Sequence, residues 1–179
     1  DARQAAREAA ERDGRTGWKF TLHMPSYLPV MQYADSRRLR AAMYRAYATR
    51  ASEFGPEELD NSPLIRRILE LRREQAQLLG YDNYAEVSLV PKMAESVPQV
   101  IDFLQDLACK ARPFAEKDIA DLRTFAFAEL NLATLEAWDV AYVSEKLLQA
   151  RYAFSEQEVK QYFTEERVLT GLFKVIERL

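Results

Sequence analysis

Histidine and cysteine are almost absent from this sequence, which has one of each, His23 and Cys109, in 179 residues. A single cysteine excludes an intrachain disulfide and is consistent with a cytoplasmic location. Because Cys109 lies among the apolar residues Leu107, Ala108 and Ala111, we expect a small buried side chain rather than a nucleophile. A single histidine excludes a di-iron site built on two Glu-x-x-His motifs and leaves a His-Glu-x-x-His zinc motif incomplete.

Other catalytic motifs are missing as well. No Gly-x-Ser-x-Gly turn is present to expose a serine nucleophile, and His23 lies in a strand-like stretch where we expect a structural role. Gly14 and Gly17 are not followed by Lys-Ser or Lys-Thr, so there is no phosphate-binding loop. Carboxylates are abundant, but we expect them to be solvated or paired with nearby arginines, as for Glu70 and Arg73. We therefore predict no catalytic, cofactor-binding or metal-ligating residue in this chain, and the pattern leaves the substrate-binding residues unknown.

The sequence has neither an excess of positive charge nor a long apolar run. Its 25 Lys and Arg residues are balanced by 28 Asp and Glu residues, which makes the formal net charge −3. This balance predicts no nucleic-acid partner, because phosphate binding depends on clustered positive charge. Charged residues interrupt every apolar stretch well before the ~20 residues that cross a bilayer, so we expect no membrane partner.

Glycine and proline are few, five and seven respectively, and they stand where helices would begin or end. We therefore expect a mainly α fold, an irregular array of several helices. Residues 1–12 are rich in the helix formers Ala, Arg and Glu, and Gly14 and Gly17 end that stretch. Residues 18–24 alternate bulky apolar with polar side chains up to Pro25, which predicts one short strand or hairpin.

Polar residues with capping ability mark the starts of the expected helices. Asp35 and Ser36 can cap a helix that we expect to run to Gly55, and Ser62 can cap a helix that Gly80 would end in the left-handed conformation. Pairs with the three-residue separation of a capping box mark three further starts: Asn83 with Glu86, Ser96 with Gln99, and Ser155 with Glu158. Pro113 is expected to kink or divide the helix that follows Ser96. Apolar stripes predict two last helices, near residues 140–148 and 168–179.

We interpret residues 1–179 as one helical segment of a larger protein, without internal repeats or flexible linkers. The chain begins without methionine, and its last apolar stripe reaches Leu179 without a capping residue. Residues 1–13 are therefore expected to belong to a helix cut at its N-terminal end, and residues 164–179 to a helix cut at its C-terminal end. The uncovered face of that last helix predicts self-association.

Aromatic residues are the remaining candidates for contacts with a ligand, because they combine apolar surface with a hydrogen-bonding group. We expect most of them to fill the core. They are Tyr27, Tyr33, Tyr44, Tyr47, Tyr81, Tyr84, Trp138 and Tyr142.

A succession of short stretches, in order and spacing, resembles the thimet oligopeptidase family of zinc metallopeptidases. The stretches are KFTLHMPSYLPVM (19–31), YRAYATRAS (44–52), LLGYDNYAE (78–86), PFAEKD (113–118), WDVAYVSEK (138–146), YAFS (152–155), YF (162–163) and GLF (171–173). None is a mechanistic signature alone, but together they cover most of the chain.

This resemblance implies a neurolysin-like helical fold in which two lobes flank a deep channel, with zinc held by His-Glu-x-x-His and a later glutamate. Those residues would lie beyond Leu179, so the resemblance implies zinc in the longer protein and none in this segment. The implied partners are short peptide substrates and the remaining peptidase domain. The segment would then shape a channel that admits short peptides and excludes folded proteins. The alternative is a stand-alone helical protein-interaction module that binds a partner helix.

Overall fold

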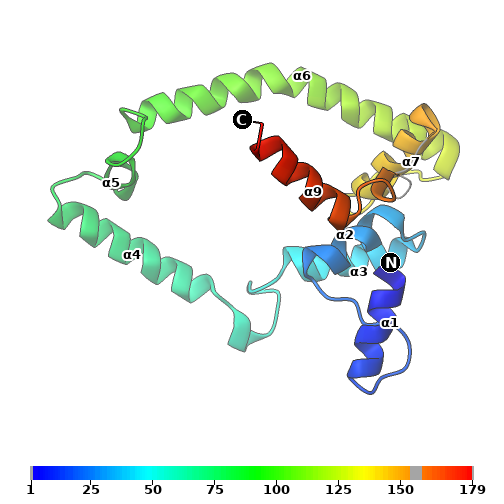
Figure 1. Cartoon of the computed structure of the whole chain (residues 1–179). Coiled ribbons are helices and arrows are strands. Elements are labelled where there is room, and N and C mark those ends of the chain that lie inside the picture. Colours follow the sequence, from blue (N-terminus) through cyan, green and yellow to red (C-terminus); the bar gives the residue numbers. More distant parts are fainter. Residues whose placement is uncertain (1, 154–158, 179) are drawn as a thin grey trace. The chain divides into compact units, whose positions relative to one another are not determined.

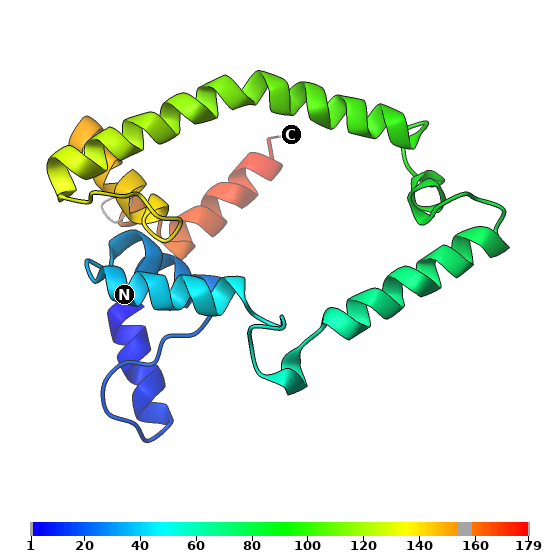
Figure 2. The same ribbon diagram turned by 180° about the vertical axis from the view of Figure 1, so that it is seen from behind.

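The computed structural model describes residues 2–153 and 159–178, and its regular elements within those ranges are all helical. Figures 1 and 2 show these helices from opposite sides. They are α1 (Ala2–Arg12), α2 (Met24–Tyr33), α3 (Arg37–Ala48), the 3-10 turn η1 (Glu57–Leu59), α4 (Ser62–Leu78), α5 (Tyr84–Leu89), α6 (Val97–Leu130), α7 (Val140–Tyr152) and α9 (Glu165–Ile176). The prediction of a mainly α fold is confirmed. In the described part of the chain, no helix is both long and apolar enough to cross a membrane.

The chain divides into two compact units, one made of residues 1–43 and 122–179 and the other of residues 44–121. In the first unit, α2 packs against both α1 and α7. The buried side chains of α1 are the small Ala6 and Ala10, whereas α2 buries the larger Tyr27, Val30 and Met31. The buried apolar residues of this unit are Ala6, Ala10, Tyr27, Val30, Met31, Leu122, Ala126 and Val143.

In the second unit, α4 packs against α5. Hydrogen bonds hold the end of α4 and the start of α5 on either side of the turn that connects them. The N–H of Gly80 donates to the Gln77 carbonyl, and the N–H of Tyr81 donates to the Ala76 carbonyl, which is the Schellman arrangement. Gly80 has φ +80°, the left-handed conformation that this arrangement requires. Asn83 then starts α5, accepting a 3.1 Å hydrogen bond from the N–H of Glu86. The predicted left-handed terminator and capping box are thus confirmed.

The predicted strand at residues 18–24 is wrong. Residues 18–23 form an irregular connection, and α2 already begins at Met24, with Pro25 in its first turn where a missing N–H is tolerated. The backbone of the connection is bonded to helices rather than to a partner strand: Lys19 N–H donates to the Ala6 carbonyl, and Thr21 N–H donates to the Ser26 hydroxyl. An alternating pattern forms a strand only where a second strand can pair with it, and the described chain offers none.

Two helix boundaries also differ from expectation. The helix that Ser36 caps ends at Ala48 rather than at Gly55, because the Thr49 hydroxyl donates to a carbonyl of the last turn and Ala51 turns into the left-handed region at φ 55°. Pro113 lies inside α6, which the structure shows as one continuous helix, so the proline does not divide it.

The remaining helix predictions have mixed outcomes. Ser96 caps α6 with a reciprocal bond between Gln99 and the backbone of Glu95, and helices are present at α7 and α9 as predicted. The predicted Ser155–Glu158 capping box lies outside the described residues.

Candidate functional site

His23 and Cys109, the single histidine and the single cysteine, belong to no group of metal-binding side chains within the described residues. Across residues 2–153 and 159–178, no three His, Cys, Asp or Glu side chains gather closely enough to hold a metal ion. His23 is exposed at the N-terminus of α2, where its carbonyl accepts hydrogen bonds from Ser26 and Tyr27.

Cys109 corrects another expectation, because it is exposed on α6 rather than buried. Its apolar neighbour Leu107 is about half exposed as well. The apolar stripe around Cys109 predicted a buried face, but Phe103, Leu104 and Leu107 are about half exposed, so within the described chain this part of α6 is not covered.

The most organised polar cluster surrounds Asp139, whose side chain is completely buried just before α7. Its Oδ2 accepts hydrogen bonds from Nη2 of Arg37 at 2.7 Å and from Nε of Arg37 at 3.0 Å. Its Oδ1 accepts a 2.8 Å bond from Nη2 of Arg40, and the Glu136 backbone N–H donates to Oδ2 at 3.2 Å. Paired carboxylate and guanidinium groups offset the cost of burying charge best when their remaining donors are also satisfied, a condition that Arg40 meets only in part because its buried Nε has no hydrogen-bond partner.

Arg40 connects this cluster to the loop between α2 and α3. Its side chain is 1% exposed, and its Nη1 donates to the carbonyls of Ala34 at 2.6 Å and Asp35 at 3.3 Å. Its guanidinium lies 4.0 Å from the ring centre of Tyr142, a cation–π distance. The Tyr142 hydroxyl in turn donates a 2.8 Å hydrogen bond to the Asp35 carboxylate. One arginine therefore ties α3, the α2–α3 loop and α7 together.

The environment shifts two pKa values in this cluster. Burial raises the pKa of Asp139, but the hydrogen bonds from Arg37 and Arg40 outweigh it, so the net pKa lies below the ordinary 3.8. Burial, with a smaller contribution from the Asp35 carboxylate, raises the pKa of the Tyr142 phenol above 10.0. Both groups keep their ordinary charge near neutral pH, and the carboxylate is saturated with donors. This chemistry suits holding helices in position rather than acid–base catalysis.

The sequence alone did not reveal this cluster, although Tyr142 was one of the aromatic candidates. Arg40 and Asp139 are 99 residues apart, and no local spacing connects them. Arg40 lies on a helix with three other arginines, so the sequence alone does not distinguish this buried arginine from solvent-exposed ones. The only signal was Asp139 standing between a tryptophan and an apolar helical stripe.

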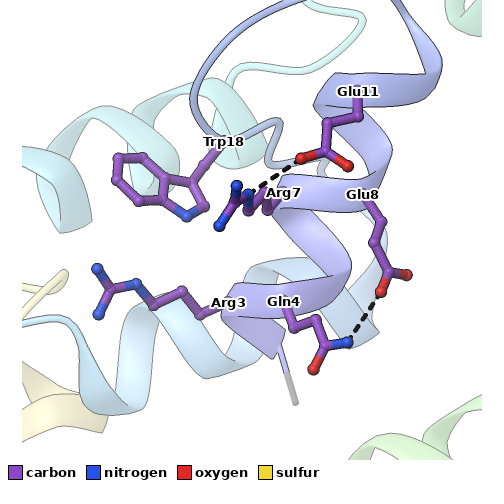
Figure 3. Close-up of a pocket in the computed structure, with 6 residues that line it drawn as sticks. All are labelled: Arg3, Gln4, Arg7, Glu8, Glu11 and Trp18. Carbon is purple, nitrogen blue, oxygen red and sulfur yellow. Dashed lines mark hydrogen bonds and ion pairs between the residues drawn. The ribbon is translucent and has the colours of Figure 1, made fainter.

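Two hollows lie in the first unit beside α1. The first, of about 670 Å³, is formed by polar side chains and one indole on the surface of α1: Arg3, Gln4, Arg7, Glu8, Glu11 and Trp18. Figure 3 shows the Arg7–Glu11 and Gln4–Glu8 pairs that occupy it. The Arg7–Glu11 pair is more than half exposed at both ends, so it contributes little to stability and marks a solvated face.

The second hollow has about 530 Å³ and a more apolar lining. Its walls come from α1, the connection before α2, α2 itself and the start of α3. The lining residues are Ala2, Arg3, Phe20, Pro29, Val30, Tyr33, Ala34, Asp35 and Leu39.

The aromatic candidates are less buried than expected. Tyr27 alone is buried, Tyr81 is exposed, and the other six are intermediate. Tyr142 joins the Asp139 cluster, Tyr33 lines the second hollow, and Trp138 lines a smaller hollow of about 300 Å³ with Arg37. The candidates of the second unit form no common site, and two of them stack under arginines, Tyr47 under Arg50 and Tyr84 under Arg72.

Comparison with known proteins gives one consistent result. The family model described as peptidase family M3 matches residues 30–179. Oligopeptidase A of Salmonella typhimurium is 51% identical over 177 residues, which are 98% of this chain and 26% of that protein. Oligopeptidase A of Haemophilus influenzae is 49% identical over 99% of this chain and 26% of its own length. Probable cytosolic oligopeptidase A of Arabidopsis thaliana is 43% identical over 90% of this chain and 23% of its own length. The chain thus spans about a quarter of the length of these relatives.

Proposed function

The chain belongs to peptidase family M3, and we propose that it is a helical, non-catalytic segment of a zinc-dependent oligopeptidase that hydrolyses short peptides. The observation that carries this proposal is the identity of about one half over nearly the whole chain to bacterial proteins named oligopeptidase A.

The zinc ion and its ligands belong, in this proposal, to the remaining part of the peptidase. Support comes from the described residues, which bring no three ligand side chains together and include the single histidine on an exposed loop. A catalytic zinc site requires three protein ligands and an open position for water. In this proposal, the remaining part of the peptidase is a partner of this segment.

The role proposed for the segment is to form part of the wall of the substrate channel. A wall that selects substrates by length must keep its shape, and the buried Asp139–Arg40 pair supplies such rigidity by tying α3 to the start of α7. Substrates would then be selected by their access to the channel, which short flexible peptides would enter and folded proteins would not.

We also propose a cytoplasmic location and a capacity for self-association. The location is supported by the one cysteine and by the relative whose name includes the word cytosolic. Self-association is supported by α9, on which a row of apolar side chains is about half exposed: Val168, Leu169, Leu172, Phe173 and Ile176. If the isolated chain stays monomeric at high concentration, self-association is wrong.

The channel role is tested in the full-length peptidase by replacing residues 44–121 with a shorter linker and measuring cleavage of peptides of increasing length. We expect longer peptides to become substrates while zinc content and the rate on short peptides are kept. Asp106→Asn, in an exposed pair with Lys110, is the matched control. An unchanged length limit in a variant that retains zinc would contradict the channel role.

A further inference from the structure

The second unit presents a methionine side chain that is completely exposed. Met93 lies in the connection between α5 and α6 (Figure 1), and its relative exposure of 101% is the highest among the exposed large apolar residues of the described chain. Methionine is usually one of the most buried residue types. The fold therefore leaves the Met93 thioether as open to dissolved reagents as it would be in an unfolded chain.

The connection that carries Met93 is held on both sides of this residue. On one side, the Lys92 N–H donates a 2.7 Å hydrogen bond to the Leu89 carbonyl at the end of α5. On the other side, the Glu95 N–H donates a 2.7 Å hydrogen bond to Oε1 of Gln99 in the first turn of α6. Met93 is thus exposed by a defined backbone geometry and not at a free chain end.

Met93 also borders a hollow of about 540 Å³, which leaves room for a reagent to approach the sulfur. Apolar side chains from the end of α5 and the start of α6 line this hollow next to Met93, among them Val90, Val97 and Pro98. Met93 contributes the one sulfur atom among the residues that line it. An oxidant that enters the hollow therefore meets a single oxidisable sulfur.

We propose that Met93 is a modification site, at which peroxides convert the thioether to methionine sulfoxide. A lone pair of the Met93 sulfur attacks one oxygen of hydrogen peroxide, and the O–O bond breaks as the S–O bond forms. The second oxygen takes up the proton of the first and leaves as water, so sulfur loses two electrons and the peroxide gains them. The sulfoxide is polar, and methionine sulfoxide reductases convert it back to the thioether. The proposal goes beyond the peptidase role, because it requires neither zinc nor a peptide substrate.

The other three methionines provide comparisons within the same chain. Met31 on α2 is 3% exposed, Met24 at the start of α2 is 51% exposed, and Met43 on α3 is intermediate. Oxidation requires contact between the peroxide and the sulfur, so the rates should follow exposure. Met93 should react first and Met31 last, because Met31 is reached only when the packing around α2 opens locally.

The test is peptide mapping by mass spectrometry after timed exposure of the 179-residue chain to dilute hydrogen peroxide. Cys109 is first blocked with iodoacetamide, because an exposed thiol also consumes peroxide. The rate at each methionine is divided by its rate in the chain unfolded in urea. We expect a ratio near unity for Met93 and a ratio at least about tenfold lower for Met31. Methionine sulfoxide reductases should then return Met93 to its original mass.

Substitution identifies the reacting side chain. Met93→Leu keeps an apolar side chain of similar volume and should remove the fastest oxidation, whereas the matched control Met24→Leu should leave it unchanged. Equal ratios for Met93 and Met31 in the unaltered chain, or a Met93 ratio as low as that of a buried methionine, would overturn the proposal without reliance on any variant. Because no peptide is cleaved in this experiment, that result would leave the peptidase proposal standing.

Discussion

The carboxylate of Asp139, which has no solvent exposure, lies 2.8 Å from the guanidinium of Arg40, which is 1% exposed. The two residues come from α3 and from the turn before α7, so a single buried ion pair joins parts of the chain that are 99 residues apart. Charges this deeply buried are tolerated only as a pair, and the loss of either partner leaves an uncompensated charge in the core.

Asp139→Asn should therefore destabilise the protein by about 3–5 kcal/mol, the usual cost of breaking a buried pair. Urea unfolding followed by far-ultraviolet circular dichroism measures the change. Arg37→Gln should cost less, because Arg37 is 38% exposed and its loss leaves Arg40 paired. The exposed control Asp106→Asn should cost at most about 0.5 kcal/mol. Equal effects of Asp139→Asn and Asp106→Asn would show that the buried pair has no special role.

The same pair predicts an acid dependence of stability. Because the pKa of Asp139 is below 3.8 in the folded chain, its contribution is fully present above the unfolded pKa and is lost as pH falls through the folded pKa. The stability difference between the unaltered chain and Asp139→Asn should hence be constant from about pH 7 to about pH 5 and shrink below about pH 4. A difference that grew on acidification would mean that the folded pKa is raised, contrary to the geometry.

Gly80 provides a test of the turn between α4 and α5. Its φ of +80° is unfavourable for a residue with a Cβ, although no heavy atom lies within 4 Å of where that Cβ would stand. Gly80→Ala should thus cost about 1–2 kcal/mol through backbone conformation alone. Gly171→Ala in the middle of α9 is the matched control, also with open space around it, and should stabilise by about 0.5–1 kcal/mol. Thermal unfolding of both variants should show opposite signs, and a shared sign would refute the conformational explanation.

The capping box at the start of α5 gives a more local prediction. Asn83→Ala removes the acceptor of the Glu86 N–H and should cost about 1 kcal/mol, seen as faster hydrogen exchange of the α5 amides. Asn83→Asp keeps an acceptor oxygen and should restore protection. If both variants exchange alike, the cap does not hold the helix.

The sequence predicted the structure where the determinants are local. Gly80, Asn83 and Ser96 mark helix ends because a left-handed φ or a side-chain cap depends on only a few neighbouring residues. The strand prediction at residues 18–24 failed because strand formation depends on a pairing partner elsewhere in the chain. The prediction that Cys109 is buried failed for a related reason, because the burial of this side chain depends on what covers α6 and not on the neighbouring residues.

The candidate site was predictable only in part for the same physical reason. Tyr142 and Tyr33 were singled out as aromatic candidates, and the structure places them beside the Asp139 cluster and the second hollow. Arg40 was not singled out, and Asp35 was considered only as a helix cap, because their partners in the cluster lie about 100 residues away. Family membership, by contrast, was recognisable from the order of short stretches, and the match to peptidase family M3 over residues 30–179 confirms it.

The most direct test of the proposed role is the rate at which the purified 179-residue chain, supplied with zinc, hydrolyses an internally quenched oligopeptide. We predict no hydrolysis above the buffer rate, with full activity appearing only in the longer peptidase that contains this segment. Chelator-sensitive cleavage by the 179-residue chain alone would contradict the account, because it would place a working zinc site within residues that we propose only shape the channel.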